Sequence, residues 1–179
     1  SPGRSLISLA RPHLAELTRL TGEAAGISIP DGTDMLYLDQ LTPDSELQVR
    51  DWTGHRIPMH AVPSGQIVLA FDDKIAERVM AAPLQSFTPH TLTTVAALRK
   101  RLATVRTSGY AWALREFAPE MNSVAAGIRA TDGRVLAVLH VTVPHHAFPA
   151  ITIKPIAVRL EFRSAGVASL SLMARADGG

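Results

Sequence analysis

Two Asp-Gly turns constrain the fold of this chain more than any other sequence feature. Each turn, Asp31-Gly32 and Asp132-Gly133, lies between two runs of residues with strand-like composition. The runs are Ala24–Ile29 and Met35–Leu41, and Asn122–Arg129 and Val135–Val143. An Asp-Gly pair between such runs is typical of a tight β-hairpin, because glycine adopts the positive φ that the turn needs. The sequence therefore predicts two hairpins within an antiparallel sheet.

Helical spacing of apolar residues accounts for much of the remaining chain. It predicts helices over Leu6–Leu20 with a stop at Gly22, over Ser64–Phe71, from Asp72 or Asp73 to Ala82, and along Val95–Val105 with a cap at Thr91 or Thr93 and a stop at Gly109. We also expect a strand at Tyr110–Phe117, a short one at Leu47–Asp51, a loop at Trp52–His60 and a helical tail over Pro155–Ala176. This order predicts a single α+β domain in which helices pack on an antiparallel sheet.

Composition excludes several classes of protein. The 179 residues suit one domain, and the chain contains no cysteine, so disulfides and thiolate chemistry are excluded. Lys and Arg number 18 against 16 Asp and Glu, and the one basic run, Arg99-Lys100-Arg101, lies in a predicted helix. DNA-binding domains carry a basic stripe, so we expect no DNA contact by this chain itself.

The ends and the hydropathy of the chain indicate where the domain belongs. No signal peptide or membrane-spanning run is present, so we expect a cytoplasmic domain without membrane contact. The chain starts Ser-Pro-Gly-Arg and ends Asp-Gly-Gly. These ends indicate a piece of a longer protein.

The predicted strand Val138–Pro144 carries two polar residues where apolar packing is expected. Alternation places His140 and Thr142 on one face, and Leu139, Val141 and Val143 on the other. His140, His145 and His146 offer three imidazoles, but their spacing matches no metal motif and no carboxylate is near, which favours surface histidines over a metal site. A serine hydrolase would need Ser64 or Ser123 beside a histidine and a carboxylate, which sequence alone does not establish. No catalytic or phosphate-binding signature is present, so we expect no enzyme and no cofactor.

Three blocks of sequence resemble a known family in order and spacing. The blocks are ARPHLAELTRLTGEAAGISIPDG, GHRIPMHAVPSGQIVLAF and SGYAWALREFAPEMNSVAAGIRATDGRVLAVLHVTVP. Together they resemble the effector-binding domain of the IclR family of bacterial transcription regulators, over nearly the whole chain. The resemblance implies a GAF-like antiparallel sheet flanked by helices, spanning residues 1–179. It also implies a small-molecule pocket on the sheet, assembly as dimers or tetramers, and a winged helix-turn-helix domain upstream that binds the DNA and is absent from this chain.

The resemblance also implies which residues bind the effector. The backbone N–H pair that holds an effector in the family falls on Gly65 and Gln66, where the other interpretation of Gly65 is a tight turn into a helix. The small polar residue of the family strand motif is Ser123, for which an ordinary strand serine is an equal alternative. Two hydroxyl residues of the last strand fall on His140 and Thr142, so Thr142 keeps the residue type and His140 departs from it.

A second departure lies on the Tyr110–Phe117 strand. The acidic residue found there in the family falls on Ala113, which puts glyoxylate-like or pyruvate-like specificity in doubt. Alternation points Trp112 to the opposite face and Arg115 to the same one, which makes Arg115 the candidate ligand. Its alternative is a surface ion pair with Glu116 or Glu120.

We expect the Trp52–Met59 loop and the Met35–Leu38 strand to roof the pocket. Its apolar wall would be formed by Met35, Leu36, Trp52, Ile57 and Met59, although core packing explains each of them individually. Such a wall favours a larger aromatic or aliphatic acid over a two-carbon one. A buried, neutral imidazole near pKa 6.5 at His140 would also make binding sensitive to pH.

The predicted function is allosteric control of an attached DNA-binding domain by a small organic acid. Two alternatives remain open at the level of sequence. One is a GAF-type sensor attached to another output, such as a kinase or cyclase. The other is an enzyme that uses His140 and Ser123.

Overall fold

A six-stranded antiparallel sheet forms the centre of the molecule. The computed structural model describes residues 2–44, 50–145, 156–162 and 168–174. The sheet order is β3-β2-β1-β6-β5-β4, so β1 of the first hairpin pairs with β6 of the second one. The strands are β1 (Ala24–Asp31), β2 (Asp34–Leu41), β3 (Arg56–Pro58), β4 (Tyr110–Leu114), β5 (Met121–Arg129) and β6 (Val135–Pro144).

Both predicted hairpins are confirmed. Asp31 pairs with Asp34 across the first turn, and Gly32 there has a φ of 63°. The second turn joins β5 to β6, and Gly133 has a φ of 88°. Glycine adopts these left-handed values without the clash that a Cβ would cause, which is why each turn closes over so few residues.

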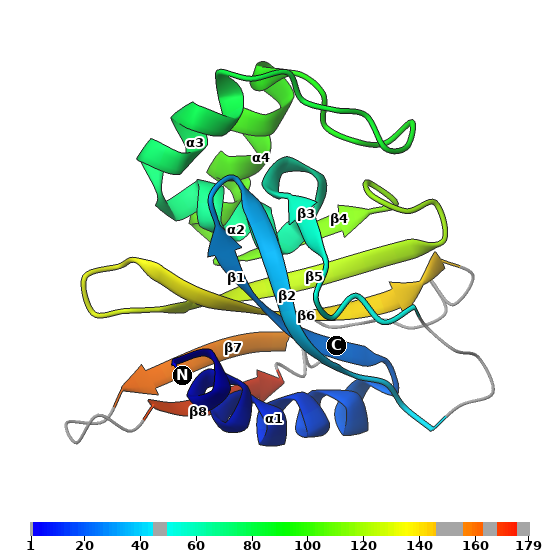
Figure 1. Ribbon diagram of the computed structural model, residues 1–179, viewed down its shortest axis with the longest axis vertical. Coiled ribbons are helices and arrows are strands. Elements are labelled where there is room, and N and C mark those ends of the chain that lie inside the picture. The colour runs from blue at the N-terminus through cyan, green and yellow to red at the C-terminus, as the bar shows by residue number, and fades with distance from the viewer. Residues whose placement is uncertain (1, 45–49, 146–155, 163–167, 175–179) are drawn as a thin grey trace, which may run out of the picture.

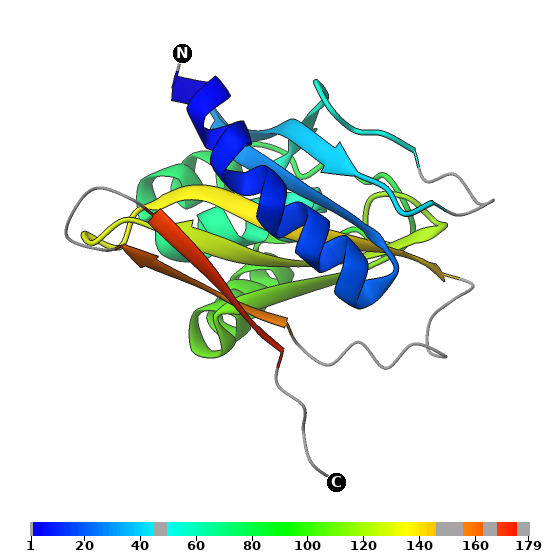
Figure 2. The same cartoon turned by 90° about the horizontal axis from the view of Figure 1, so that it is seen from below.

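Helices cover the two faces of the sheet unequally (Figure 1). On one face lie α2 (Pro63–Phe71), α3 (Asp73–Met80) and α4 (Val95–Ser108), with the short 3₁₀ helix η1 (Met59–Ala61) leading into α2. On the other face α1 (Pro2–Thr21) runs across the strands, as Figure 2 shows from below. The prediction of one α+β domain with an antiparallel sheet flanked by helices is confirmed.

Each face of the sheet has its own apolar core. Leu14 and Leu17 of α1 are fully buried against Leu139, Val141 and Val143 of β6. On the other face, side chains of α2 and α4 pack on Ala111, Ala125 and Val138. The odd-numbered residues of β6 from Ala137 to Val143 therefore face α1, which leaves the even-numbered His140 and Thr142 on the α2 side. This confirms the alternation predicted for that strand.

Four predictions of local structure are wrong or shifted. The tail is not helical, because Ile156–Phe162 (β7) and Ala168–Ala174 (β8) pair as an antiparallel hairpin that lies beside α1 (Figures 1 and 2). The predicted loop at Trp52–His60 contains β3 and most of η1, since β3 extends the sheet edge by pairing with β2.

β4 ends at Leu114 because Arg115 turns the chain with a φ of 57°. The α4 cap is Thr94, whose side chain accepts from the Ala97 N–H. The Leu47–Asp51 strand lies largely outside the described residues.

The start of α3 depends on a side-chain cap. Asp72 accepts a hydrogen bond from the Ile75 N–H at 3.0 Å, which satisfies one of the free donors of the first helical turn. We expect Asp72→Ala to lower the free energy of unfolding by about 1 kcal/mol in urea titrations. Asp73→Ala is the matched control, because Asp73 lies within the same turn without capping it and should cost less than half as much. Equal losses would contradict the capping role.

Candidate functional site

A cavity lies on the face of the sheet that α2, α3 and α4 cover. It is enclosed by β2, by the C-terminal half of β6 and by the start of α2. Its free volume is about 40 Å³. It is lined by Tyr37, Trp52, Ile57, Ala61, Val62, Pro63, Ala113, Glu116, Phe117, Ala118, Met121, Ser123, His140 and Thr142. Apolar and aromatic groups dominate this lining, with a few polar atoms among them, which is the usual composition of a small-molecule site.

His140 occupies its place because the neighbouring strand carries a glycine. Gly26 of β1 is its register partner, and a Cβ on Gly26 would lie 2.5 Å from His140 Cε1. On its other side the imidazole meets the Tyr37 ring edge-on, with the ring centroids 5.1 Å apart. The absence of a side chain at Gly26 thus creates the space into which the ring folds.

Burial determines the charge of His140. The side chain is almost fully buried, and desolvation lowers the pKa of the imidazole to about 4. The ring is therefore neutral throughout the range from pH 5.5 to 8. The pKa of the imidazole therefore lies below the value near 6.5 that the sequence suggested, while the pH sensitivity of binding stays a prediction.

Two ring nitrogens in the cavity lining have no hydrogen-bond partner among the described residues. They are Nε1 of Trp52 and Nδ1 of His140, and both are buried. An unsatisfied buried polar atom costs roughly 1–3 kcal/mol, so native structures rarely retain one without a reason. Both residues line the cavity, which makes these two nitrogens the candidate hydrogen-bonding groups for a polar ligand.

Three aromatic side chains of the cavity lining, Tyr37, Trp52 and Phe117, are fixed by contacts with their neighbours. Trp52 meets Phe117 edge-to-face with centroids 5.4 Å apart, and the Arg50 guanidinium lies 4.3 Å from the centre of the indole. Tyr37 shares a hydrogen bond of 2.9 Å with Ser64, and burial raises the pKa of its phenol to about 12. These contacts fix the rings, so the unpartnered Trp52 N–H has a defined direction.

The start of α2 presents the positive end of a helix dipole to the cavity. Val62 and Pro63 line the cavity, and no side chain caps this helix. The predicted N–H pair at Gly65 and Gln66 is not free as a pair, since the Gln66 N–H donates to Val62 O at 3.1 Å. Gly65 is packed so closely on η1 that a Cβ would lie 2.2 Å from Met59 O. A tight entry into the helix therefore explains this glycine.

The predicted apolar wall is only partly in the cavity. Trp52 and Ile57 line it, whereas Met35 and Met59 are fully buried in the core beside it and are not part of the lining. Ala113 and Ser123 do line it and are register partners on β4 and β5. Ser123 Oγ donates to Val141 O at 3.1 Å, so its proton is not directed at His140 as a catalytic pair would require.

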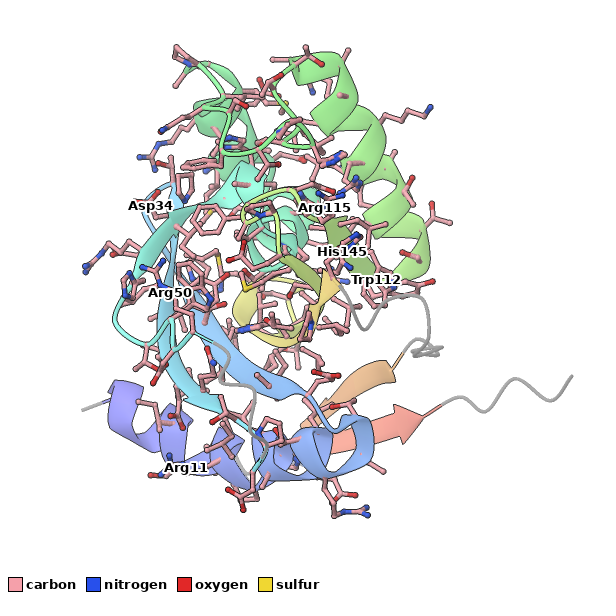
Figure 3. The ribbon with its side chains drawn as sticks, turned by 90° about the vertical axis from the view of Figure 1, so that its right-hand side faces the viewer. Arg11, Asp34, Arg50, Trp112, Arg115 and His145 are labelled. Atoms are coloured by element: carbon pink, nitrogen blue, oxygen red, sulfur yellow. The ribbon has the colours of Figure 1, made fainter. Side chains whose placement is uncertain are left out.

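Arg115 does not reach the cavity. The chain turns at this residue, so strand alternation no longer sets the direction of its side chain, and Arg115 Nε donates to Pro119 O at 2.9 Å. Figure 3 labels it beside the turn between β4 and β5. Its expected ion pair with Glu116 is also absent from the described residues, because Glu116 pairs with Arg101 of α4 instead.

The histidines in and after β6 do not form a metal site in the described part of the chain. His140 is buried inside the fold, while His145 Nδ1 lies 3.3 Å from Asn122 Nδ2. His146 lies outside the described residues. Among the residues that the structure describes, no three His, Asp or Glu side chains are grouped closely enough to hold a metal ion.

Comparison with known proteins identifies the family. Residues 3–158 match the family described as the bacterial transcriptional regulator IclR C-terminal domain. The chain belongs to the IclR family.

Individual IclR relatives support the same assignment. The chain is 29% identical over 143 residues to the HTH-type transcriptional repressor AllR of Escherichia coli K12, covering 79% of this chain and 53% of the relative. It thus spans about half the length of the curated relatives that it matches. An IclR homologue from Microbacterium hydrocarbonoxydans, solved with 4-hydroxybenzoate, is 28% identical with a TM-score of 0.75, covering 80% of this chain and 60% of that one.

A more distant IclR structure supports the fold alone. The IclR protein of Thermotoga maritima has a TM-score of 0.74 at 23% identity, covering 80% of this chain and 59% of that one.

Within the described residues of our chain, no helix has both the length and the apolar character needed to cross a membrane.

Sequence reasoning missed two lining residues of this IclR domain that bear polar groups. Tyr37 lies inside the predicted roof strand, but its alternation there gave no sign of a contact with His140. Glu116 was interpreted as a surface residue because the strand was expected to continue to Phe117. The early end of β4 rotates its carboxylate into the fold, where it is 4% exposed.

Proposed function

We propose that this domain binds a small organic acid, with an aromatic carboxylate as the best-supported class. The single observation that carries the proposal is that two residues lining one cavity, Trp52 and His140, each have a buried ring nitrogen without a hydrogen-bond partner among the described residues. The uncapped start of α2 supports a negatively charged group, because helix N-termini attract anions. The relative that was solved with 4-hydroxybenzoate supports an aromatic ring.

The size of the free cavity supports a role in switching. At about 40 Å³ it is much smaller than the roughly 150 Å³ cavity that accepts benzene in another protein. An aromatic acid therefore enters only when the walls move apart. A ligand that binds the open form alone shifts the population towards that form. We propose that this change reaches a winged helix-turn-helix domain that precedes the chain in the full regulator, and that the domain assembles with further copies of itself as a dimer or tetramer.

A thermal-shift screen tests the ligand class directly. We expect aromatic carboxylates such as 4-hydroxybenzoate to raise the melting temperature, because a ligand that binds only the folded state stabilises it by mass action. Acetate, glyoxylate and pyruvate serve as small acids that match in charge. The proposal is wrong if only the two- and three-carbon acids stabilise the domain.

Trp52→Phe separates ligand binding from stability. Phenylalanine keeps the ring contact with Phe117 but removes the unpartnered N–H. We expect the affinity for 4-hydroxybenzoate to fall about tenfold, the effect of losing one hydrogen bond to a charged acceptor. The free domain should change in stability by less than about 1 kcal/mol, since the lost ring area and the removed buried donor have opposite effects.

Trp112→Phe is the matched control for calorimetric titration. Trp112 packs against the core on the other face of the sheet, so its replacement should leave the affinity unchanged. Equal affinity of Trp52→Phe and the wild type would remove the indole N–H from the site.

A further inference from the structure

Arg101 of α4 forms an ion pair with Glu116, which lines the cavity. Its Nη1 is 3.0 Å from Glu116 Oε1 and 2.9 Å from Oε2, and it also lies 3.0 Å from Gln66 Oε1 and from Trp112 O. The Arg101 side chain is 26% exposed and that of Glu116 is 4% exposed. Arg101 itself is not part of the cavity lining. It therefore acts on the cavity only through the residues that it holds.

Glu116 is held from several sides. Besides Arg101, its carboxylate accepts from Gln66 Nε2 at 3.1 Å and from the Leu114 N–H at 3.3 Å. Its backbone carbonyl accepts from Thr91 Oγ1 at 2.6 Å. The carboxylate thus has a fixed position in the wall, and the helix that carries Arg101 determines it together with α2.

The cavity lining contains one charged side chain, and it has the wrong sign for an acid. Of the described lining residues only Glu116 carries a formal charge, and no Lys or Arg is among them. A carboxylate ligand would share a poorly hydrated space with the Glu116 carboxylate. Two like charges a few ångströms apart in such surroundings repel each other strongly unless a cation lies between or beside them.

We propose that Arg101 sets the charge specificity of the effector cavity: by pairing with Glu116 from behind, it cancels the negative charge of the wall and so permits an acid to bind. This inference rests on the proposed function. Arg101 is a positioning residue in this scheme, since it contacts Glu116 and not the ligand. Its effect should therefore depend on the charge of the ligand, which a role in stability alone does not predict.

Calorimetric titration with 4-hydroxybenzoate and 4-hydroxybenzamide tests this dependence on charge. The two probes have nearly the same shape and differ in the charge of one group. In Arg101→Gln we expect the affinity for the acid to fall at least about tenfold, while that for the amide changes less than about threefold. Adding Glu116→Gln to this variant removes the uncompensated charge and should restore the affinity for the acid to within about threefold of wild type.

Two further variants complete the experiment. Arg99→Gln is the matched control, because Arg99 lies on the same helix in an exposed pair with Glu77 and should leave both affinities unchanged. Glu116→Gln alone leaves Arg101 unneutralised and should favour the acid over the amide by several-fold, so the proposal remains testable if Arg101→Gln does not fold.

The outcomes separate this inference from the proposed function. Equal losses of acid and amide in Arg101→Gln, or no recovery in the double variant, would overturn the role of Arg101 while leaving the effector site in place. Failure of the wild type to bind either aromatic probe contradicts the proposed function and this inference with it.

Discussion

Replacing Gly65 with alanine is expected to lower the free energy of unfolding by about 3 kcal/mol or more, or to prevent folding. A Cβ at this position would lie 2.2 Å from Met59 O, 2.3 Å from Met59 Cα and 2.6 Å from Met59 C. All three are backbone atoms, so no side-chain rotation relieves the overlap. Met59 is itself fully buried, and relief would require η1 to separate from α2. Urea denaturation followed by circular dichroism measures the loss.

Gly127→Ala is the matched control for this prediction. Gly127 is a partly buried strand glycine whose added Cβ would meet the Ile67 Cγ2 methyl at 2.9 Å, a contact with one side-chain atom and not with the backbone. We expect a loss of about 1–2 kcal/mol there. A Gly65→Ala domain as stable as the Gly127→Ala domain would show that α2 and η1 separate easily, contrary to the packing described.

Acidification is expected to destabilise the domain through His140. Burial lowers the pKa of its imidazole to about 4, whereas the unfolded chain titrates near the ordinary value of 6.5. Between these two values the unfolded state binds more protons than the folded state, so stability falls as pH falls. The loss is about 1.4 kcal/mol per pH unit and totals about 3 kcal/mol between pH 6.5 and pH 4, below which this group adds nothing more.

The comparison of variants isolates this contribution from that of other groups. Free energies of unfolding measured from pH 7.5 to pH 4 should fall less steeply in His140→Gln than in the wild type, by most of that 3 kcal/mol. His90→Gln is the control, because His90 is exposed and its replacement should leave the wild-type slope intact. Parallel curves for the wild type and His140→Gln would mean that the imidazole is hydrated in the folded state.

The sheet was predictable because its signals are local. The Asp31-Gly32 and Asp132-Gly133 turns fix the two hairpins, and the alternation along β6 correctly separated His140 and Thr142 from the α1 face. Where the signal was not local the prediction failed. The tail over Pro155–Ala176 has apolar residues that suit a helix or a strand, and its pairing partner, not its own pattern, decided the outcome.

The site was less predictable than the fold for a related reason. Ala113, Ser123, His140 and Thr142 were assigned to the pocket through the family resemblance, and all four line the cavity. They lie in regular strands, where strand position sets the direction of a side chain. Arg115 is the left-handed residue that follows the end of β4, and Glu116 comes directly after it, so a one-residue error in the strand end exchanges which side chain points inward. The partnership of Glu116 with Arg101 joins residues from two elements, and nothing in a single sequence reports it.

The small volume of the cavity has a consequence for the effector concentration at which a regulator of this kind responds. When only a minor open form accepts the ligand, the apparent dissociation constant equals the intrinsic one divided by the open fraction. Under the proposed function, sensitivity to the effector is therefore set by the packing of residues that the ligand displaces, such as Phe117 and Met121, as well as by its direct contacts. Substitution of a smaller side chain in the cavity wall therefore changes the effector concentration at which such a sensor responds, without altering any group that recognises the ligand.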